Sequence, residues 1–550
     1  MPRRRTVAGV PADLATITRD VGSLLVMQSG LMGLSIGVAV LAREFYAAGA
    51  FLLAGVLTGA VGMAARRRFA EAPEPRLKHG MVVAAAGWLS TAVFGALPFF
   101  LTASLTPQAV AAGFVPAGAD YATSSLYVFR DPLHALFESM SGWTGSGLTM
   151  ATHEPSLPRT IQWWRSLIQY VGGVGVIVLT VTILARPGSG SYALYQSEAR
   201  EERIHPSIVS TVRTVWKLFL GYTLLSVVAL FVAIRLSDYG SSLPLWQAGW
   251  QALNHAMTGL STGGFSVTDN SVATYDSPLI ETALLPVMTI GAIAFPVHYA
   301  VLADRDVSQL WSDLQTRWLF VLLAVGAVVL SIQNAVTLPA GSFTGTANYA
   351  GLRSVGVPAP VADAVRDSTF QFVSALSCTG FQSAPIGDWA AGGKLLVAGA
   401  MTLGGAAGST VGGLKIIRGY TIVRGIKWQF SRVFLPPNAV VHAHIGDRLL
   451  DRETMEREFS EAAIVSLLWL LLLVASSLLL VNVVGAEFTY ADALFEVASA
   501  QGNVGLSTGI TGPSMPAAAE AAFLVNMWVG RLEIIPVLVF ARSALYGLDP

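Results

Sequence analysis

The sequence predicts an all-α polytopic membrane protein in which four repeated units surround a central ion pathway, preceded by two extra transmembrane helices. Of its 550 residues, 53% are hydrophobic and only 12% are charged, and the mean hydropathy is +0.58. A soluble protein has about a quarter of its residues charged, so the expected surroundings are a lipid bilayer. The formal net charge is zero, and no global field favours nucleic acid as a partner.

Apolar runs account for most of the chain. A transmembrane helix needs about 20 mostly apolar residues, and about ten runs meet this requirement: 21–42, 46–65, 81–103, 161–185, 214–236, 278–302, 316–337, 392–414, 461–485 and 519–545. Basic residues gather in alternate connections, including Arg3 to Arg5, Arg66 to Arg68 and 186–217. The positive-inside rule then puts both termini in the cytoplasm, with the chain in the plasma membrane (the bacterial inner membrane).

Two further features of the sequence bear on targeting and on cysteine chemistry. The basic N-terminus is followed by no short apolar region with a small-residue cleavage site, so the first apolar run is expected to be a retained span. The one cysteine, Cys378, excludes an internal disulfide framework and a cysteine-rich metal site.

A short helical run ending in a glycine turn follows every second span, counting from the third. The four runs are LFESMSGWTGSGLT, ALNHAMTGLSTGGFS, TFQFVSALSCTGFQS and LFEVASAQGNVGLST. Aligned on Gly147, Gly264, Gly380 and Gly505, they share a small hydroxyl six residues earlier and a polar side chain nine residues earlier. These glycines are 117, 116 and 125 residues apart, which indicates an internal repeat.

The repeat divides the chain into five parts. We expect an N-terminal stretch with the two extra helices, then four repeats, the third of which includes a gating loop and a cytoplasmic segment. The expected boundaries are 1–80, 81–190, 191–310, 311–460 and 461–550.

Four copies of one hairpin around an axis predict a pore whose narrowest part is a ring of glycine turns. A cation that loses its water there needs carbonyl oxygens in replacement, and glycine reaches backbone angles that turn them inward. The C-terminal end of each short helix favours a cation as well. For a single motif the alternative is ordinary helix termination. The expected ion-binding residues are Gly145, Ser146, Gly147, Thr262, Gly263, Gly264, Cys378, Thr379, Gly380, Asn503, Val504 and Gly505.

The run GGAAGSTVGG, residues 404–413, interrupts the eighth apolar stretch. So many small residues have little tendency to stay helical, and unwound backbone at membrane depth must lie against protein or water. Close helix packing through small residues is the alternative. The residues expected to be unwound here include Gly404, Gly405, Gly408, Ser409, Thr410, Gly412 and Gly413.

Arg531 lies about ten residues into the last apolar run. Burying its charge there costs at least about 2.5 kcal/mol on insertion scales, so it is expected to face a water-filled cavity or a partner. Glu533 is two positions away and points from another face of the helix, which argues against a local ion pair. Two roles remain open: a charge that projects into the pore below the turns, or a structural pair with another span.

Three further charged residues lie near the turns. Arg165, near the outer end of its span, is interpreted as a snorkelling or packing residue that steadies the first turn. Glu138 and Glu496 are expected to hydrogen-bond neighbouring repeats and hold the turns in place. Direct cation binding by the two glutamates is the alternative.

Several motifs resemble the Trk/Ktr/HKT potassium-transporter superfamily: the four glycine turns, WWRSLIQYVGGVGVIVL (163–179), GGAAGSTVGGLKIIR (404–418) and MWVGRLEIIPVLVF (527–540). Two spans before the first repeat make the chain similar to the TrkH-type membrane subunit. The resemblance implies a monovalent-cation pathway in each subunit, a homodimer, and gating by a cytosolic ring of nucleotide-binding, RCK-type regulatory subunits. It also implies that residues 404–413 are the gate, that Arg531 is an electrostatic barrier, and that glycine in all four turns goes with potassium preference.

The function expected from these features is potassium uptake through a gated, potassium-preferring pore, with K⁺ as transported ligand and no bound organic cofactor. A cation-coupled symporter (K⁺/H⁺ or K⁺/Na⁺) is the alternative within transport. An intramembrane hydrolase that uses the serine of the first turn is a remote alternative, because the sequence supplies no paired base. The chain is therefore not expected to be an enzyme. It has no P-loop, so it does not drive transport with ATP itself.

Overall fold

The computed structural model describes residues 6–184, 208–338, 359–434, 443–446 and 448–548. The expected boundary between residues 190 and 191, and the basic stretch 186–207, lie outside these residues. The first half contains β1 (Thr6–Val7), β2 (Val10–Pro11), α1 (Ala12–Leu41), α2 (Phe45–Arg68), α3 (Leu77–Leu105), α4 (Gln108–Ala112), η1 (Ser125–Arg130), α5 (Pro132–Thr144), η2 (Glu154–Ser156), α6 (Arg159–Leu184), α8 (Ile208–Leu236), α9 (Asp238–Ser241), α10 (Leu245–Leu260) and η3 (Ser271–Tyr275).

The second half contains α11 (Pro278–Ala292), α12 (Phe295–Leu302), α13 (Gln309–Ser312), α14 (Leu314–Thr337), α16 (Ala359–Leu376), η4 (Ile386–Asp388), α17 (Ala391–Thr402), α18 (Ile416–Val433), β3 (Ala443–Ile445), β4 (Arg448–Leu450), α19 (Arg452–Val483), α20 (Tyr490–Gly502), α21 (Ala517–Leu532) and α22 (Ile534–Tyr546). The strands form two small antiparallel hairpins, β1 with β2 and β3 with β4. The described fold is therefore mostly helical, as the composition predicts.

Helix starts are set by short polar residues that accept orphan N–H groups. Asp131 accepts from Leu133 N at 2.8 Å before α5, where Pro132 occupies the first turn. Thr489 and Asp492 form a reciprocal capping box at the start of α20. These caps fix where two of the short helices begin, and so where they end.

Among the described residues, six helices are long and apolar enough to cross a membrane, or eight if each of two bent helix pairs is one span. The pair α11 and α12 bends by 109°, with Pro296 in the first turn of α12, and α21 and α22 bend by 114°. The predicted spans 278–302 and 519–545 are thus each made of two helices with a sharp bend between them, and they stay candidate spans. The expected span 392–414 is helical only as far as Thr402. The number ten stays a prediction.

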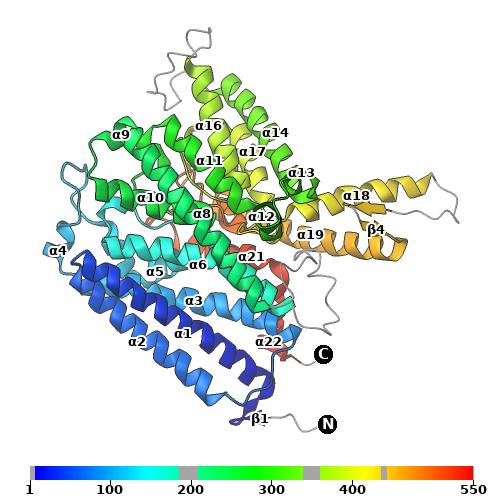
Figure 1. The fold of residues 1–550 in the computed structure, drawn as a ribbon, viewed down its shortest axis with the longest axis horizontal. Coiled ribbons are helices and arrows are strands. Elements are labelled where there is room, and N and C mark those ends of the chain that lie inside the picture. Colours follow the sequence, from blue (N-terminus) through cyan, green and yellow to red (C-terminus); the bar gives the residue numbers. More distant parts are fainter. Residues whose placement is uncertain (1–5, 185–207, 339–358, 435–442, 447, 549–550) are drawn as a thin grey trace.

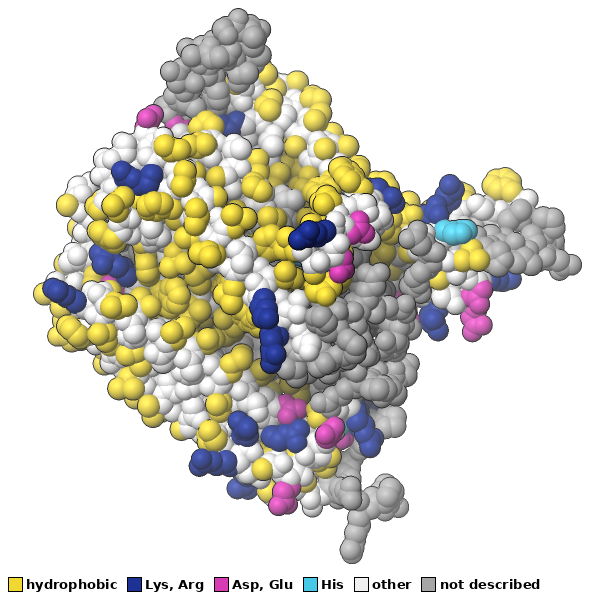
Figure 2. Space-filling view, viewed as in Figure 1, with side chains coloured by type: hydrophobic (Ala, Val, Ile, Leu, Met, Phe, Trp, Pro, Cys, Tyr) yellow, Lys and Arg dark blue, Asp and Glu magenta, His cyan; other side chains and the backbone are white. Residues whose placement is uncertain are grey.

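The bundle has one projecting arm. Figure 1 shows α1 and α2 side by side at one edge against α3, while α18 and α19 extend away from the bundle with the β3–β4 hairpin. The described ends of the chain lie near each other, and Lys78 Nζ donates to Leu548 O at 3.2 Å. Hydrophobic side chains spread over much of the face in Figure 2, and many of those on the long helices are exposed. Such a surface is suited to lipid rather than water.

Each short helix packs on the long helix that precedes it in the chain. The pairs are α5 on α3, α10 on α8, α16 on α14 and α20 on α19. Apart from their outer ends, these short helices are largely buried. The arrangement brings the four helix C-termini into the interior, where the glycine-rich segments follow them.

Candidate functional site

The four glycine turns are residues 145–147, 262–264, 378–380 and 503–505. Each turn places two residues in the left-handed region of backbone space. The first residue has φ of 69° at Gly145, 52° at Thr262, 51° at Cys378 and 54° at Asn503. The last has φ of 77° at Gly147, 74° at Gly264, 81° at Gly380 and 109° at Gly505. The left-handed cap ends each helix, and the final glycine allows a second positive φ without steric cost.

One backbone hydrogen bond recurs in all four glycine turns. The N–H of the middle residue donates to the carbonyl five residues earlier: Ser146 to Ser141 at 2.8 Å, Gly263 to Thr258 at 2.8 Å, Thr379 to Ser374 at 2.9 Å and Val504 to Ser499 at 2.9 Å. The side-chain hydroxyl that recurs at that earlier position makes a local hydrogen bond in three turns. Thr258 and Ser374 each donate to the carbonyl after the final glycine at 2.8 Å, and Ser499 accepts from Gly505 N at 3.0 Å.

The four glycine turns lie against one another in a closed ring. A Cβ added to any final glycine would come within 3.0 Å of the carbonyl oxygen of the middle residue in another turn. The pairs are Gly147 with Gly263, Gly264 with Thr379, Gly380 with Val504, and Gly505 with Ser146. Glycine is therefore required at these positions for two independent reasons: the positive φ, and the close approach of the neighbouring backbone.

Residues 404–413, the small-residue loop, are not helical. Their backbone is satisfied by protein: Ala406 N donates to Ala292 O at 3.1 Å and Thr410 N to Gly291 O at 3.2 Å. Gly408 O accepts from Phe295 N at 3.1 Å. The loop thus fits into the break between α11 and α12, which meets the requirement for irregular backbone at membrane depth. The alternative of a helix-packing face is wrong.

Arg531 connects the small-residue loop to α6. Its guanidinium donates to Thr410 O at 2.6 Å, to Gly172 O at 2.8 Å and to Gly173 O at 3.0 Å. The side chain is 5% exposed and lies close to Gly145 of the first turn. Among the described contacts its partners are carbonyls of the loop and of α6 and not a carboxylate. The expected structural link to another span is therefore present, made to backbone carbonyls, and the role of Arg531 as a charge in the pore stays a prediction.

Comparison with known proteins agrees with this arrangement. The TrkH family model, described as a cation transport protein, matches residues 79–546. The chain belongs to the TrkH family. An uncharacterized cation transporter of Methanocaldococcus jannaschii is 31% identical over 90% of this chain and 89% of its own length. The Trk system potassium uptake protein TrkH of Escherichia coli is 29% identical over 95% of this chain and 97% of its own length.

The fold is also that of a solved family member. The crystal structure of the potassium transporter TrkH from Vibrio parahaemolyticus superimposes with a TM-score of 0.75 at 23% identity, over 97% of this chain and 99% of that one. The TrkH family consists of transporter subunits rather than enzymes. Because this chain belongs to that family and has several helices apolar enough to cross a membrane, it is a multi-pass membrane protein.

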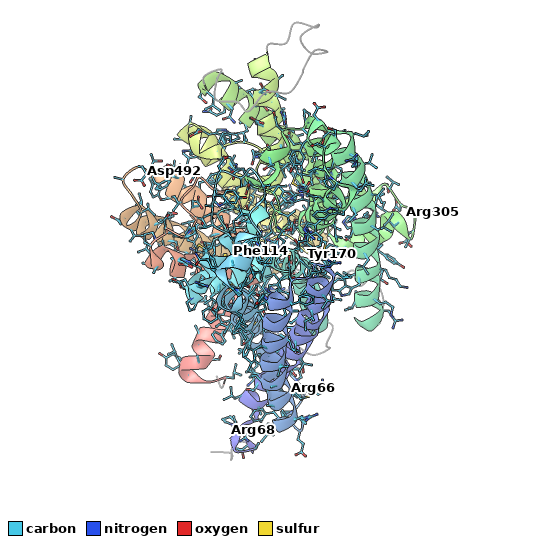
Figure 3. All side chains as sticks on the ribbon, turned by 90° about the vertical axis from the view of Figure 1, so that its left-hand side faces the viewer. Arg66, Arg68, Phe114, Tyr170, Arg305 and Asp492 are labelled. Atoms are coloured by element: carbon cyan, nitrogen blue, oxygen red, sulfur yellow. The ribbon has the colours of Figure 1, made fainter. Side chains whose placement is uncertain are left out.

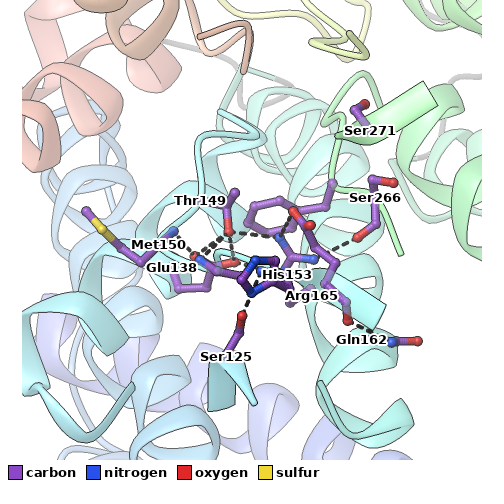
Figure 4. A network of polar contacts seen from close by, with 12 residues as sticks. Ser125, Glu138, Thr149, Met150, His153, Gln162, Arg165, Ser266 and Ser271 are labelled. Atoms are coloured by element: carbon purple, nitrogen blue, oxygen red, sulfur yellow. Dashed lines mark hydrogen bonds and ion pairs between the residues drawn. The ribbon is translucent and has the colours of Figure 1, made fainter. Parts of the chain in front are cut away.

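In this TrkH-family chain, Glu138 and Arg165 form a buried pair beside the first turn (Figure 4). Arg165 Nε lies 2.7 Å from Glu138 Oε1, and the two side chains are 1% and 0% exposed. The carboxylate also accepts from Thr149 Oγ1 at 2.9 Å and from Met150 N at 2.8 Å. The prediction of a packing role is confirmed and that of snorkelling is wrong, because a carboxylate partner lies within the protein.

Arg165 further joins the first turn to the second. It donates to Ser266 O at 2.8 Å, and its guanidinium lies 4.2 Å from the ring centre of Phe265. Glu138 itself bonds the segment after its own turn. The expectation that this glutamate bonds a neighbouring repeat was therefore wrong, since Arg165 makes that connection.

Glu496 holds the segment after the fourth turn. It accepts from Ser507 Oγ at 2.6 Å, Thr508 N at 2.7 Å and Thr511 Oγ1 at 2.7 Å. Here too the bonds stay within one repeat, contrary to expectation. The equivalent polar residues do the same in the other two: His255 Nε2 lies 2.9 Å from Ser266 Oγ, and Gln371 Nε2 donates to Ser383 Oγ at 3.0 Å.

Gln169 is a contact residue that sequence reasoning missed. Its Nε2 donates to Gly263 O at 2.6 Å, and its Oε1 accepts from Phe265 N at 3.0 Å. The side chain is 0% exposed. An amide inside an apolar run was the available signal, since such a group needs a polar partner.

The glycines that follow Gln169 let α6 approach two turns at once. A Cβ at Gly172 would collide with the backbone of Trp143, and one at Gly173 would collide with Ser261. Gly172 and Gly173 also present the carbonyl oxygens to which Arg531 donates hydrogen bonds. This explains physically why α6 carries two adjacent glycines at this depth.

Glu533 marks the break between α21 and α22. Its φ of 56° and ψ of 160° end the first helix, and its carboxylate pairs with the buried Arg418 of α18. The described ion pair of Glu533 is thus with Arg418 rather than with Arg531, its neighbour two positions away. The pair instead joins the helix after the small-residue loop to the bend of the last span.

Proposed function

We propose that this chain is the ion-translocating subunit of a Trk-type system, which takes up potassium across the plasma membrane through a gated, potassium-preferring pore. The observation that carries the proposal is the closed ring of glycine turns, in which left-handed backbone and carbonyl oxygens meet at the ends of four buried helices. The names of the relatives given above, Trk system potassium uptake proteins among them, support K⁺ as the substrate.

In this proposal the four glycine turns form a selectivity filter within four repeats, 81–190, 191–310, 311–460 and 461–550. Dehydrated K⁺ is held by turn carbonyls, and the negative ends of α5, α10, α16 and α20 stabilise it. Glu138, Arg165 and Glu496 support the filter from outside it. Their contacts with the segments beyond the turns argue for that role over direct cation binding.

The small-residue loop is proposed as the gate and Arg531 as the electrostatic barrier below the filter. The loop has no helical hydrogen bonds to break, so its conformation depends on side contacts such as those of Arg531. Lys415 and Arg418 follow it directly and offer a route by which a cytosolic partner can pull. We propose a homodimer, both termini in the cytoplasm of a bacterial cell, and a ring of nucleotide-binding, RCK-type subunits as that partner.

Ion flux in proteoliposomes tests the function. We expect K⁺ and Rb⁺ to pass more readily than Na⁺ and Li⁺, and the Gly147→Ser variant to insert but to lose the K⁺ preference. Unchanged flux and preference in that variant would overturn the pore assignment. Uptake against a K⁺ gradient that depends on a second ion would instead favour the symporter (K⁺/H⁺ or K⁺/Na⁺).

A further inference from the structure

A groove of about 500 Å³ lies where the α1–α2 hairpin meets the segments that follow the first two glycine turns. Its lining includes Arg43 and Phe45 from the hairpin, Phe114 after α4, Arg159 at the start of α6, and Trp246 in the first turn of α10. Figure 3 shows Phe114 far from Arg66 and Arg68, which mark the opposite end of α2. The groove therefore opens on the same side of the membrane as the segments beyond the glycine turns.

The groove carries two arginines whose charges are not used within it. The Arg159 guanidinium lies 4.1 Å from the ring centre of Trp246, so its flat face is held while its N–H edge stays available. Both Arg43 and Arg159 are exposed. In the part of the chain that the structure describes, neither guanidinium has a carboxylate partner.

The one acidic residue among those that line the groove, Glu44, is already committed. Its carboxylate accepts from Arg159 N at 2.8 Å, Thr160 N at 2.9 Å and Thr160 Oγ1 at 2.6 Å. It thereby caps α6, whose positive N-terminal end balances its charge. The groove is left with an excess of positive charge.

The groove also lies at the depth of lipid headgroups. The helix α1 ends at Leu41, which is 86% exposed, and α2 begins at Phe45, which is 66% exposed. Trp246 is 53% exposed beside Leu245 at 67%. Exposed aromatic rings at the ends of apolar helices are typical of the membrane–water interface, where lipid phosphates lie.

We propose that this groove binds the headgroup of an anionic phospholipid from the adjacent leaflet, with its phosphate between Arg43 and Arg159. The planar guanidinium fork matches a phosphate in two hydrogen bonds. The glycerol and first acyl carbons lie against Phe45 and Trp246. Two arginines against one occupied carboxylate favour a lipid with net negative charge over a zwitterionic one.

A bound lipid would connect the hairpin to the glycine turns. Gln162 at the groove accepts from Trp250 Nε1 at 2.7 Å and donates to Glu154 O at 2.9 Å, and Val267 of the second segment also lines it. The α1–α2 hairpin lies outside the ring of the four glycine turns. A lipid bound in the groove would contact both the hairpin and the segments that follow the first two turns.

Native mass spectrometry of the purified full chain tests this proposal. The protein is titrated with phosphatidylglycerol or with phosphatidylcholine that carries the same acyl chains. We expect at least one additional phosphatidylglycerol to be retained over phosphatidylcholine, and the R43A/R159A variant to lose that difference with at least a fivefold drop in occupancy. The control is R66A/R67A, which removes two arginines from the opposite end of α2 and should keep the extra lipid.

Three results would overturn the proposal: equal retention of the two lipids by the wild type, full retention by R43A/R159A, or an equal loss in R66A/R67A. Competition by millimolar inorganic phosphate that removes the lipid completely would assign the site to free phosphate instead. If R43A/R159A does not fold, R43Q/R159Q, which keeps long polar side chains, replaces it. The same loss is expected, and retention there would also overturn the proposal.

Discussion

The guanidinium of Arg531 donates a hydrogen bond of 2.6 Å to the carbonyl oxygen of Thr410, at the centre of the small-residue loop. The same side chain holds two carbonyls of α6, at Gly172 and Gly173. Thr410 is held from a second side, since its hydroxyl lies 3.0 Å from that of Thr262 in the second turn. Arg531 is thus both a charge near the first turn and a clamp on the loop.

Charge and clamp can be separated by substitution. Arg531→Gln removes both, and we expect K⁺ flux without a regulatory partner to rise roughly 10- to 150-fold, because a hydrogen bond to a charged group is worth about 1.5–3 kcal/mol. Arg531→Lys keeps the charge but cannot span three carbonyls, and an intermediate rise is expected. The measurement is Rb⁺ uptake into proteoliposomes.

The exposed Arg317 at the start of α14 offers the control for Arg531, and Arg317→Gln should leave flux unchanged. Wild-type flux in Arg531→Lys would show that charge alone matters and the clamp does not. Wild-type flux in Arg531→Gln would remove both roles.

The ring contacts predict which substitutions the turns reject. Gly380→Ala would place a Cβ against Val504 O while forcing φ of 81° on a side chain, a conformation that costs roughly 1–2 kcal/mol before any clash. We expect an inserted protein whose K⁺ preference over Na⁺ is lost. Gly512→Ala is the matched control, because Gly512 lies beyond the fourth turn with no atom within 4 Å of the added Cβ. Preserved selectivity in Gly380→Ala would contradict the ring.

Gln169 is expected to determine selectivity without touching the loop. Gln169→Glu keeps the acceptor for Phe265 N but replaces the donor to Gly263 O with a charged oxygen, so the second turn loses its outer support. An unmade buried hydrogen bond costs about 1–3 kcal/mol. We predict a lower K⁺/Na⁺ permeability ratio in bilayer recordings, with the protein still folded.

Two comparisons make the Gln169 prediction specific. The exposed Gln108→Glu should leave the permeability ratio as in the wild type. Loss of thermal stability in Gln169→Glu with an unchanged ratio would mean that the residue serves packing alone.

The sequence was sufficient to predict what depends on local pattern. The glycine turns recur at nearly constant spacing, and each is built from bonds within one short helix and its turn, as between Ser146 and Ser141. The small-residue loop was likewise predictable, because its composition disfavours a helix whatever surrounds it. Such features need no knowledge of how the spans pack.

The features that sequence reasoning missed depend on distant partners. The bend at Glu533 is held by Arg418, from another helix far along the chain, and no pattern in residues 519–545 reveals it. For Arg165 the sequence leaves both snorkelling and packing open, because its carboxylate partner, Glu138, lies on a different helix. The role of Gln169 could not be predicted for the same reason, since its hydrogen-bond partners belong to the second turn and the residue that follows it. Tertiary contacts decide these cases, and a hydropathy pattern does not contain them.

The buried pair of Glu138 and Arg165 should be costly to break from either side. Removing one partner leaves an uncompensated buried charge, which costs about 3–5 kcal/mol. We expect Glu138→Ala and Arg165→Ala each to lower the unfolding free energy by that amount, as measured by titration with SDS. The double variant should lose clearly less than the sum.

The control for that pair is the exposed pair of Arg452 and Glu456, 3.1 Å apart. Arg452→Ala removes this pair and leaves Glu456 its second partner, Arg432, so it should cost about 0–1 kcal/mol. Strictly additive losses in the double variant at 138 and 165 would show that the two side chains do not stabilise each other.

Glu154, in the segment between the first turn and α6, gives the structure a pH dependence. Burial raises its pKa from 4.5 to about 7, although Arg165 nearby acts in the opposite direction. A raised carboxyl pKa means that the folded state holds the proton more tightly than the unfolded state. The stability that this proton contributes is complete below about pH 4.5 and is lost as the pH rises through 7.

We expect the thermal unfolding midpoint of the wild type to fall between pH 5 and pH 8. Glu154→Gln stays neutral, so its unfolding midpoint should fall less over the same range, and this variant should be more stable than the wild type at pH 8. The exposed Asp388→Asn serves as control and should follow the wild-type profile. Parallel profiles for Glu154→Gln and the wild type would show that Glu154 does not titrate in this range.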